Sequence, residues 1–174
     1  MTDRSVDKMP GGQLPASGNA LELGPLRQDL PFLSRNLRAL LRTEGTMLRE
    51  RLGIESGMIG VLNIVWLNPG ISQNDLAGSV ALKKSAVTKV VQLLEANKLL
   101  ARQRTQSDRR YKALKLTPAG EELVRNIRLE TDRLHAEWFE GVKQDDRDIF
   151  FDVLIRILAN LGRKYGGALD AEES

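Results

Sequence analysis

The feature that most constrains the fold is a change in the spacing of apolar residues in the middle of the chain. Val87, Val91 and Leu94 recur at intervals of three and four, the period of one helix face. After Leu100 the pattern becomes an alternation, which resumes beyond a polar stretch at residues 106–108. The change predicts a helix followed directly by a β-hairpin whose loop lies in that polar stretch.

Helical spacing also marks the segments on both sides of this unit. Helices are expected over about 30–51, 56–67, 73–79, 83–96, 118–140 and 145–162. Residues 1–28 are rich in Gly, Pro, Ser and Asp, and we expect a flexible N-terminal arm there. Residues 163–174 are expected to form a flexible tail. The prediction is a mainly α fold with one small β-hairpin, built as a single domain over residues 29–162.

The amino-acid composition excludes several classes of protein function. The chain has no cysteine, so disulfides, zinc–thiolate sites and thiol nucleophiles are excluded, and its one histidine, His135, cannot form a multi-histidine metal site. Without a Gly-rich phosphate loop either, we expect no enzyme activity, catalytic residue, metal or cofactor. No apolar run approaches the roughly 20 residues that span a bilayer, and the N-terminus does not resemble a secretory signal. We therefore expect a cytoplasmic protein without a membrane partner.

Positive charge is concentrated in one segment. The chain carries a formal charge of only +3, but residues 83–115 contain ten basic and two acidic residues, which gives +8 there and −5 elsewhere. A local basic stripe on an otherwise acidic chain is suited to the phosphate backbone of DNA. An ordinary solvated, charged surface is the alternative interpretation.

The predicted helix over 83–96 has the two faces that a DNA-recognition helix needs. One α-helix fills the major groove of B-DNA, which is about 12 Å wide. Lysine can contact guanine there, glutamine can contact adenine, and the threonine methyl group can contact the thymine methyl group. The candidates opposite the apolar stripe are Lys83, Lys84, Ser85, Thr88, Lys89 and Gln92. An amphipathic surface helix without DNA contacts is the alternative.

The predicted hairpin carries a possible arginine brace. Asp108 and Arg110 are two residues apart, so in an extended chain they project to the same side and the carboxylate can hold the guanidinium. A braced arginine at a hairpin tip is suited to a narrow minor groove, while Arg109 is better placed for phosphate. A turn aspartate beside two solvated arginines is the alternative. The hairpin candidates are Arg102, Arg104, Asp108, Arg109, Arg110 and Lys112.

The stretch LLARQRTQSDRRYKALKLTPAGEEL resembles the wing signature of the MarR family of bacterial regulators, and ISQNDLAGSVALKKSAVTKVVQLLEANKLL resembles that family's helix-turn-helix. The resemblance implies a winged helix-turn-helix over about 54–117, with dimerisation helices over about 30–51 and 118–162. Two positions depart from the family pattern. Lys98 replaces a usual glycine, so Asn97 or Lys98 must take the left-handed cap conformation, and Lys83 is a weaker N-cap than Ser or Thr.

The resemblance further implies a sequence-specific regulator of transcription that binds a pseudo-palindromic operator in double-stranded DNA as a homodimer. The expected mode is repression relieved by a small aromatic carboxylate or phenolic effector. Arg38, Arg42 and Trp66 could line the effector pocket; the alternative, which each residue taken singly favours, is that Trp66 is a core residue and the arginines are surface residues. Two alternatives remain at this stage: a fully intramolecular helical bundle, and a winged-helix protein-interaction module that does not bind DNA and would not need the +8 segment.

Overall fold

A computed structural model describes residues 22–79, 83–104 and 112–171. Contacts between α-carbons divide the chain into two compact units, one ending at Gly53 and the other beginning at Ile54. The first unit contains a short 3-10 helix, η1 (Gly24–Gln28), and helix α1 (Leu30–Leu52). The arm expected over residues 1–28 is therefore wrong for its last residues, because Pro25 pre-sets the backbone for the first turn of η1.

Helix α1 has a well-defined start and end. Asp29 is its N-cap, with Oδ1 accepting a hydrogen bond of 2.6 Å from the Phe32 N–H. At the other end Gly53 has φ of 64°, the left-handed conformation that favours glycine after the last turn. The expected bounds of 30–51 thus match the observed helix to within one residue, as capping chemistry predicts.

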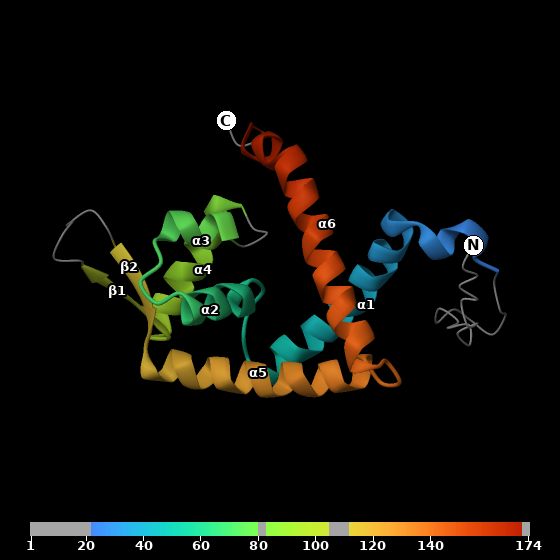
Figure 1. Ribbon diagram of the computed structural model, residues 1–174. Coiled ribbons are helices and arrows are strands. Elements are labelled where there is room, and N and C mark those ends of the chain that lie inside the picture. Colours follow the sequence, from blue (N-terminus) through green and yellow to red (C-terminus); the bar gives the residue numbers. More distant parts are fainter. Residues whose placement is uncertain (1–21, 80–82, 105–111, 172–174) are drawn as a thin grey trace. The chain divides into compact units, whose positions relative to one another are not determined.

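The second unit contains three consecutive short helices followed by a hairpin (Figure 1). Their bounds are α2 (Met58–Leu67), α3 (Gln73–Ser79), α4 (Lys84–Ala96), β1 (Leu100–Arg104) and β2 (Lys112–Leu116). One apolar core joins these elements to the helix that follows. Its fully buried side chains are Leu62, Leu76, Leu94, Leu114, Ile127, Val61, Val65, Val87, Val91 and Val124. The mainly helical fold with a small hairpin is confirmed.

The hairpin is antiparallel and tied to the helices by main-chain bonds. Leu100 pairs with Leu116, and Arg102 pairs with Leu114. On its other edge β2 meets the connection between α2 and α3: the Gly70 N–H donates to the Leu114 carbonyl at 2.8 Å, and the Leu114 N–H donates to the Ile71 carbonyl at 3.0 Å. This exchange fixes β2 against the helix-turn-helix.

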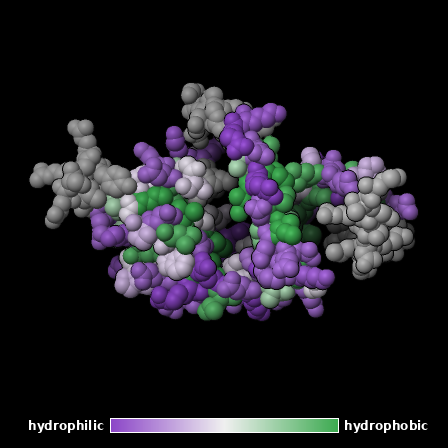
Figure 2. Space-filling model, viewed as in Figure 1, coloured by the Kyte–Doolittle hydropathy of each residue, from purple (hydrophilic) through white to green (hydrophobic). Residues whose placement is uncertain are grey.

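Two long helices complete the second unit, α5 (Pro118–Trp138) and α6 (Gln144–Ala171). The flexible tail expected from residue 163 is wrong for the backbone up to Ala171, since α6 continues through Gly162. A glycine inside a helix costs about 1 kcal/mol and does not by itself end the helix. Figure 2 shows hydrophobic surface along α6. The exposed hydrophobic side chains of this helix include Ile149, Ile155 and Leu158.

Candidate nucleic-acid interface

Helix α4 separates apolar and polar side chains onto two faces. Val87, Val91 and Leu94 are buried, as predicted, and Val90 joins them. The predicted groove-facing residues lie away from this core. Of these, Lys83, Lys84, Ser85, Lys89 and Gln92 are exposed and Thr88 is half-buried. The helix therefore offers a polar, cationic face held on a rigid apolar base, as insertion into a major groove requires.

The start of α4 carries no side-chain cap. Lys83 is the N-cap residue and its side chain makes no capping hydrogen bond, as its departure from Ser or Thr predicted. Helix α3 differs in this respect. Ser72 Oγ accepts from the Asp75 N–H at 3.1 Å and donates to Asp75 Oδ2 at 2.7 Å. Asp75 therefore closes a capping arrangement through the serine hydroxyl.

A side-chain hydrogen bond connects α3 with the exposed face of α4. The Gln73 amide nitrogen Nε2 donates to Thr88 Oγ1 at 2.9 Å, and the same hydroxyl donates to the Lys84 carbonyl at 3.0 Å. Gln73 was not predicted as a site residue from the sequence. Its position directly after an N-cap residue carries no signal for a partner fifteen residues away, because that contact depends on how the two helices cross.

The turn after α4 resolves the predicted choice between Asn97 and Lys98. Lys98 has φ of 56°, whereas Asn97 has φ of −80°. The Lys98 N–H donates to the Glu95 carbonyl at 3.0 Å and the Leu99 N–H to the Leu94 carbonyl at 2.9 Å. This pair of bonds is the Schellman motif, with lysine in the position that glycine usually takes.

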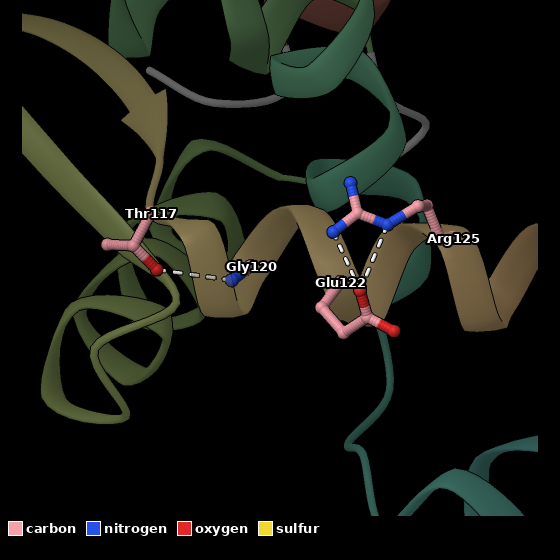
Figure 3. Close-up of polar contacts among 4 residues, drawn as sticks. All are labelled: Thr117, Gly120, Glu122 and Arg125. Carbon is pink, nitrogen blue, oxygen red and sulfur yellow. Dashed lines mark hydrogen bonds and ion pairs between the residues drawn. The ribbon is translucent and has the colours of Figure 1, made fainter.

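The same turn is fastened to the start of α5. Thr117 Oγ1 donates to the Lys98 carbonyl at 2.6 Å and accepts from the Gly120 N–H at 3.1 Å, so one hydroxyl caps α5 and holds the turn. Figure 3 shows the bond from Gly120. The Thr117 N–H adds a bond of 3.1 Å to the Leu99 carbonyl. Figure 3 also shows Arg125 bonded to Glu122 on the next turn of α5. Hydrogen bonds therefore fix both the turn from α4 into the hairpin and the connection from the hairpin into α5.

Arg102, a predicted DNA contact, is engaged with the recognition helix. Its Nε lies 2.8 Å from Glu95 Oε1, and the two side chains are 28% and 29% exposed. This ion pair connects the C-terminal half of α4 to β1. Arg102 lies on the strand predicted from the sequence, but its acidic partner was not predicted.

The tip of the hairpin lies outside the described residues. Asp108, Arg109 and Arg110 fall in that gap, so their predicted roles stay predictions. Arg104 and Lys112 pair across the strands through their backbones, and nothing is described of their side chains.

The predicted effector residues are divided between the two units. Arg38 and Arg42 are exposed on α1. Trp66 is half-buried near the end of α2, and the guanidinium carbon of Arg128, on α5, lies 4.8 Å from the centre of its ring. That distance is within the range of a cation–π interaction. Trp66 was a candidate from the sequence, whereas Arg128 was not.

The residues that the structure describes contain no group of three or more His, Asp or Glu side chains placed to hold a metal ion. Nor do their helices include one with the length and hydropathy that crossing a membrane requires.

Comparison with known proteins agrees with this geometry. Residues 54–112 match the model of the MarR family. A protein of Thauera aromatica proposed to regulate transcription of the hcr operon is 29% identical over 146 residues, covering 82% of this chain and 88% of that protein. The repressor CouR bound to a 23-mer DNA duplex is 25% identical, with a TM-score of 0.67, and the match covers 80% of this chain and 99% of that one.

The transcriptional regulator PcaV of Streptomyces coelicolor, in complex with its natural ligand, has the same fold, with a TM-score of 0.61 and 23% identity over 82% of this chain and 98% of that one. A helix-turn-helix followed by an antiparallel hairpin defines a winged helix-turn-helix protein. Residues 54–112 match a MarR-family domain, and the relatives and structural neighbours are transcriptional regulators, which confirms the resemblance found in the sequence.

Proposed function

We propose that this protein is a homodimeric repressor that places α4 in the major groove of a pseudo-palindromic operator and its hairpin wing beside the adjacent minor groove. The observation that carries the proposal is the exposed row Lys84, Ser85, Lys89 and Gln92, opposite the buried valines of the same helix. Lysine and glutamine are side chains that hydrogen-bond guanine and adenine edges. CouR in complex with a DNA duplex supports this use of the fold.

The dimer is part of the same proposal. Ile149, Ile155 and Leu158 on α6 are 61%, 64% and 60% exposed in the single chain, and exposed apolar surface of this kind is typical of an interface. Two copies related by a two-fold axis would present two α4 helices to half-sites about one helical turn apart. The operator would then mirror the symmetry of the protein.

We further propose that an aromatic carboxylate or phenol releases the protein from DNA, with Arg38, Arg42 and Trp66 contributing to its site. The natural-ligand complex of PcaV supports ligand control in this fold. An aromatic ligand could stack on an indole ring, and its carboxylate could bind a guanidinium bidentately.

The effector proposal can be tested by fluorescence. The chain has two tryptophans, so Trp138→Phe leaves Trp66 as the only indole. Benzoate should quench its emission, and cyclohexanecarboxylate should do so less. Arg38→Ala and Arg42→Ala in the same background should weaken the benzoate response. Quenching that is equal for both carboxylates and independent of both arginines would contradict the assignment of this site.

A cytoplasmic location and the absence of catalytic activity complete the proposal. The family is one of transcriptional regulators, and a protein that binds chromosomal DNA in bacteria acts in the cytoplasm. A reporter gene under the selected operator should be expressed more strongly when this protein is deleted. Lower expression on deletion would indicate activation.

The experiment that tests DNA binding is a selection from a random duplex library with the full chain, followed by titration against salt. We expect a two-fold symmetric consensus and an affinity that falls linearly in log–log coordinates as salt increases. The alternative, a winged-helix protein-interaction module, predicts no consensus and no sequence preference.

A further inference from the structure

Thr88 lies on the face of α4 that the proposed function turns towards DNA, but its hydroxyl proton and one of its two lone pairs are already used within the protein. A hydroxyl has one proton to donate and two lone pairs that accept. The proton of Thr88 Oγ1 goes to the Lys84 carbonyl at 3.0 Å, and one lone pair accepts the Gln73 amide at 2.9 Å. Gln73 is half-buried at the first position of α3, so this donor comes from a fixed element.

These two hydrogen bonds limit which groups of a base pair the Thr88 hydroxyl can contact. To donate to N7 or O6 of guanine, N7 of adenine or O4 of thymine, the hydroxyl would have to give up its bond to Lys84. Breaking an existing bond to form another yields little net free energy. The γ-methyl group has no such competing bond. Methyl groups in the major groove come from the 5-position of thymine and of 5-methylcytosine.

We propose that Thr88 recognises the 5-methyl group of a pyrimidine through its γ-methyl group, and that Gln73 is a positioning residue that holds the Thr88 hydroxyl away from the bases. The inference rests on the proposed function and names one specificity contact within it. Under this proposal Thr88 makes an apolar contact with its base, whereas its exposed neighbours on the same face of α4 offer polar contacts.

Two substitutions at residue 88 separate the methyl group from the hydroxyl. Thr88→Val keeps methyl groups and removes the hydroxyl, whereas Thr88→Ser keeps the hydroxyl and its two bonds and removes the methyl. If the methyl group reads DNA, Thr88→Val should retain the preference at its base pair and Thr88→Ser should lose it. If the hydroxyl reads DNA, the two variants should behave in the opposite way.

The methyl group can also be removed from the DNA. After selection of a consensus with the full-length wild-type chain, each thymine of one half-site is replaced in turn by uracil, which lacks only the methyl group, and affinity is measured by fluorescence anisotropy. We expect one position where uracil weakens wild-type binding about fourfold, equivalent to about 0.8 kcal/mol for one apolar carbon. Cytosine and 5-methylcytosine, each paired with guanine at that position, distinguish thymine recognition from recognition of the methyl group alone.

The variant Gln73→Ala tests the positioning role. The measured quantity is the ratio of the affinity for thymine to the affinity for uracil. A purely structural defect would lower both affinities and leave this ratio unchanged. The ratio should fall towards one in the wild-type background and stay unchanged in the Thr88→Val background, where no hydroxyl remains to be held. Higher affinity for 5-methylcytosine than for cytosine also supports the inference.

Three results would overturn it. The first is a consensus in which uracil binds as well as thymine at every position, a measurement that needs only the wild-type protein. The second is a thymine preference kept by Thr88→Ser and lost by Thr88→Val. The third is a selection that returns no consensus, which overturns the proposed function together with this inference, whereas the first two leave the proposed function intact.

Discussion

The carbonyl group of Leu99 occupies the space that any side chain at residue 120 would need. A Cβ added to Gly120 would overlap the Leu99 carbonyl oxygen and lie 3.0 Å from the carbonyl carbon and 3.4 Å from Leu116 Cβ. Because that oxygen also accepts the Thr117 N–H, it cannot move away without breaking a main-chain bond. The absence of a side chain at this glycine therefore sets how closely α5 approaches the turn between α4 and the hairpin.

We predict that Gly120→Ala lowers the free energy of unfolding by about 1–3 kcal/mol, the usual cost of overpacking a close contact. Urea denaturation at fixed protein concentration measures it. Gly78→Ala on α3 is the matched control, since a Cβ there meets nothing within 4 Å. That variant should be neutral or more stable by about 0.5–1 kcal/mol. Equal stability of the two variants would contradict the close approach.

The Schellman motif after α4 predicts a substitution that raises the free energy of unfolding. Lys98 holds φ of 56°, a conformation that costs a residue with a side chain of order 1 kcal/mol. Lys98→Gly should therefore raise the free energy of unfolding by up to about 0.5 kcal/mol, after the greater freedom of glycine in the unfolded chain is subtracted. Asn97→Gly is the control and should destabilise, because Asn97 has φ of −80° and gains nothing from glycine. The opposite ranking would refute the cap assignment.

Much of this fold could be predicted because hydrophobic spacing and caps are local. The start of α3 follows from the N-cap residue Ser72, and the change of spacing after Leu100 located the hairpin. The missed features are contacts between distant residues, such as Gln73 with Thr88 and Glu95 with Arg102. They depend on helix crossing and strand position, which no local pattern encodes. The end of α6 was missed for a different reason, since a helical glycine is a weak stop signal.

The Glu95–Arg102 ion pair predicts that Arg102 acts on the wing and not on phosphate. A phosphate contact removed by substitution lowers the magnitude of the salt dependence by about one. Arg102→Ala should weaken operator binding without that change, whereas Lys89→Ala should produce it. The pair is about 28–29% exposed, so its coupling in a double-mutant cycle with Glu95→Ala should be below about 1 kcal/mol. A reduced salt slope for Arg102→Ala would assign it to phosphate.

The exposed apolar side chains of α6 predict how the dimer can be broken. Leu158 is 60% exposed in the single chain. Leu158→Glu should weaken dimerisation by about 3 kcal/mol, because each of two copies loses the burial of one leucine, about 1.5 kcal/mol or more. Light scattering should then report monomer at micromolar concentration. Arg156→Ala is the control, since its ion pair with Asp152 is exposed and should leave the dimer unchanged.

The last prediction concerns the wing tip, where the sequence alone provides the argument. Arg110→Ala should weaken operator binding by about 1–3 kcal/mol, the scale of one specific contact. Asp108→Ala should weaken it as well, although it removes a negative charge close to DNA. Simple electrostatics predicts the reverse, because losing an anion near phosphate should strengthen binding.

The two interpretations of Asp108 therefore differ in sign. If its carboxylate braces Arg110, removing it frees the guanidinium, whose ordering on binding then costs conformational entropy. The double variant should be less impaired than the sum of the two single variants, because both remove the same interaction. Lys112→Ala should instead lower affinity for all sequences and reduce the salt slope by about one. Operator binding by Asp108→Ala equal to or tighter than wild type would leave a basic wing without a brace.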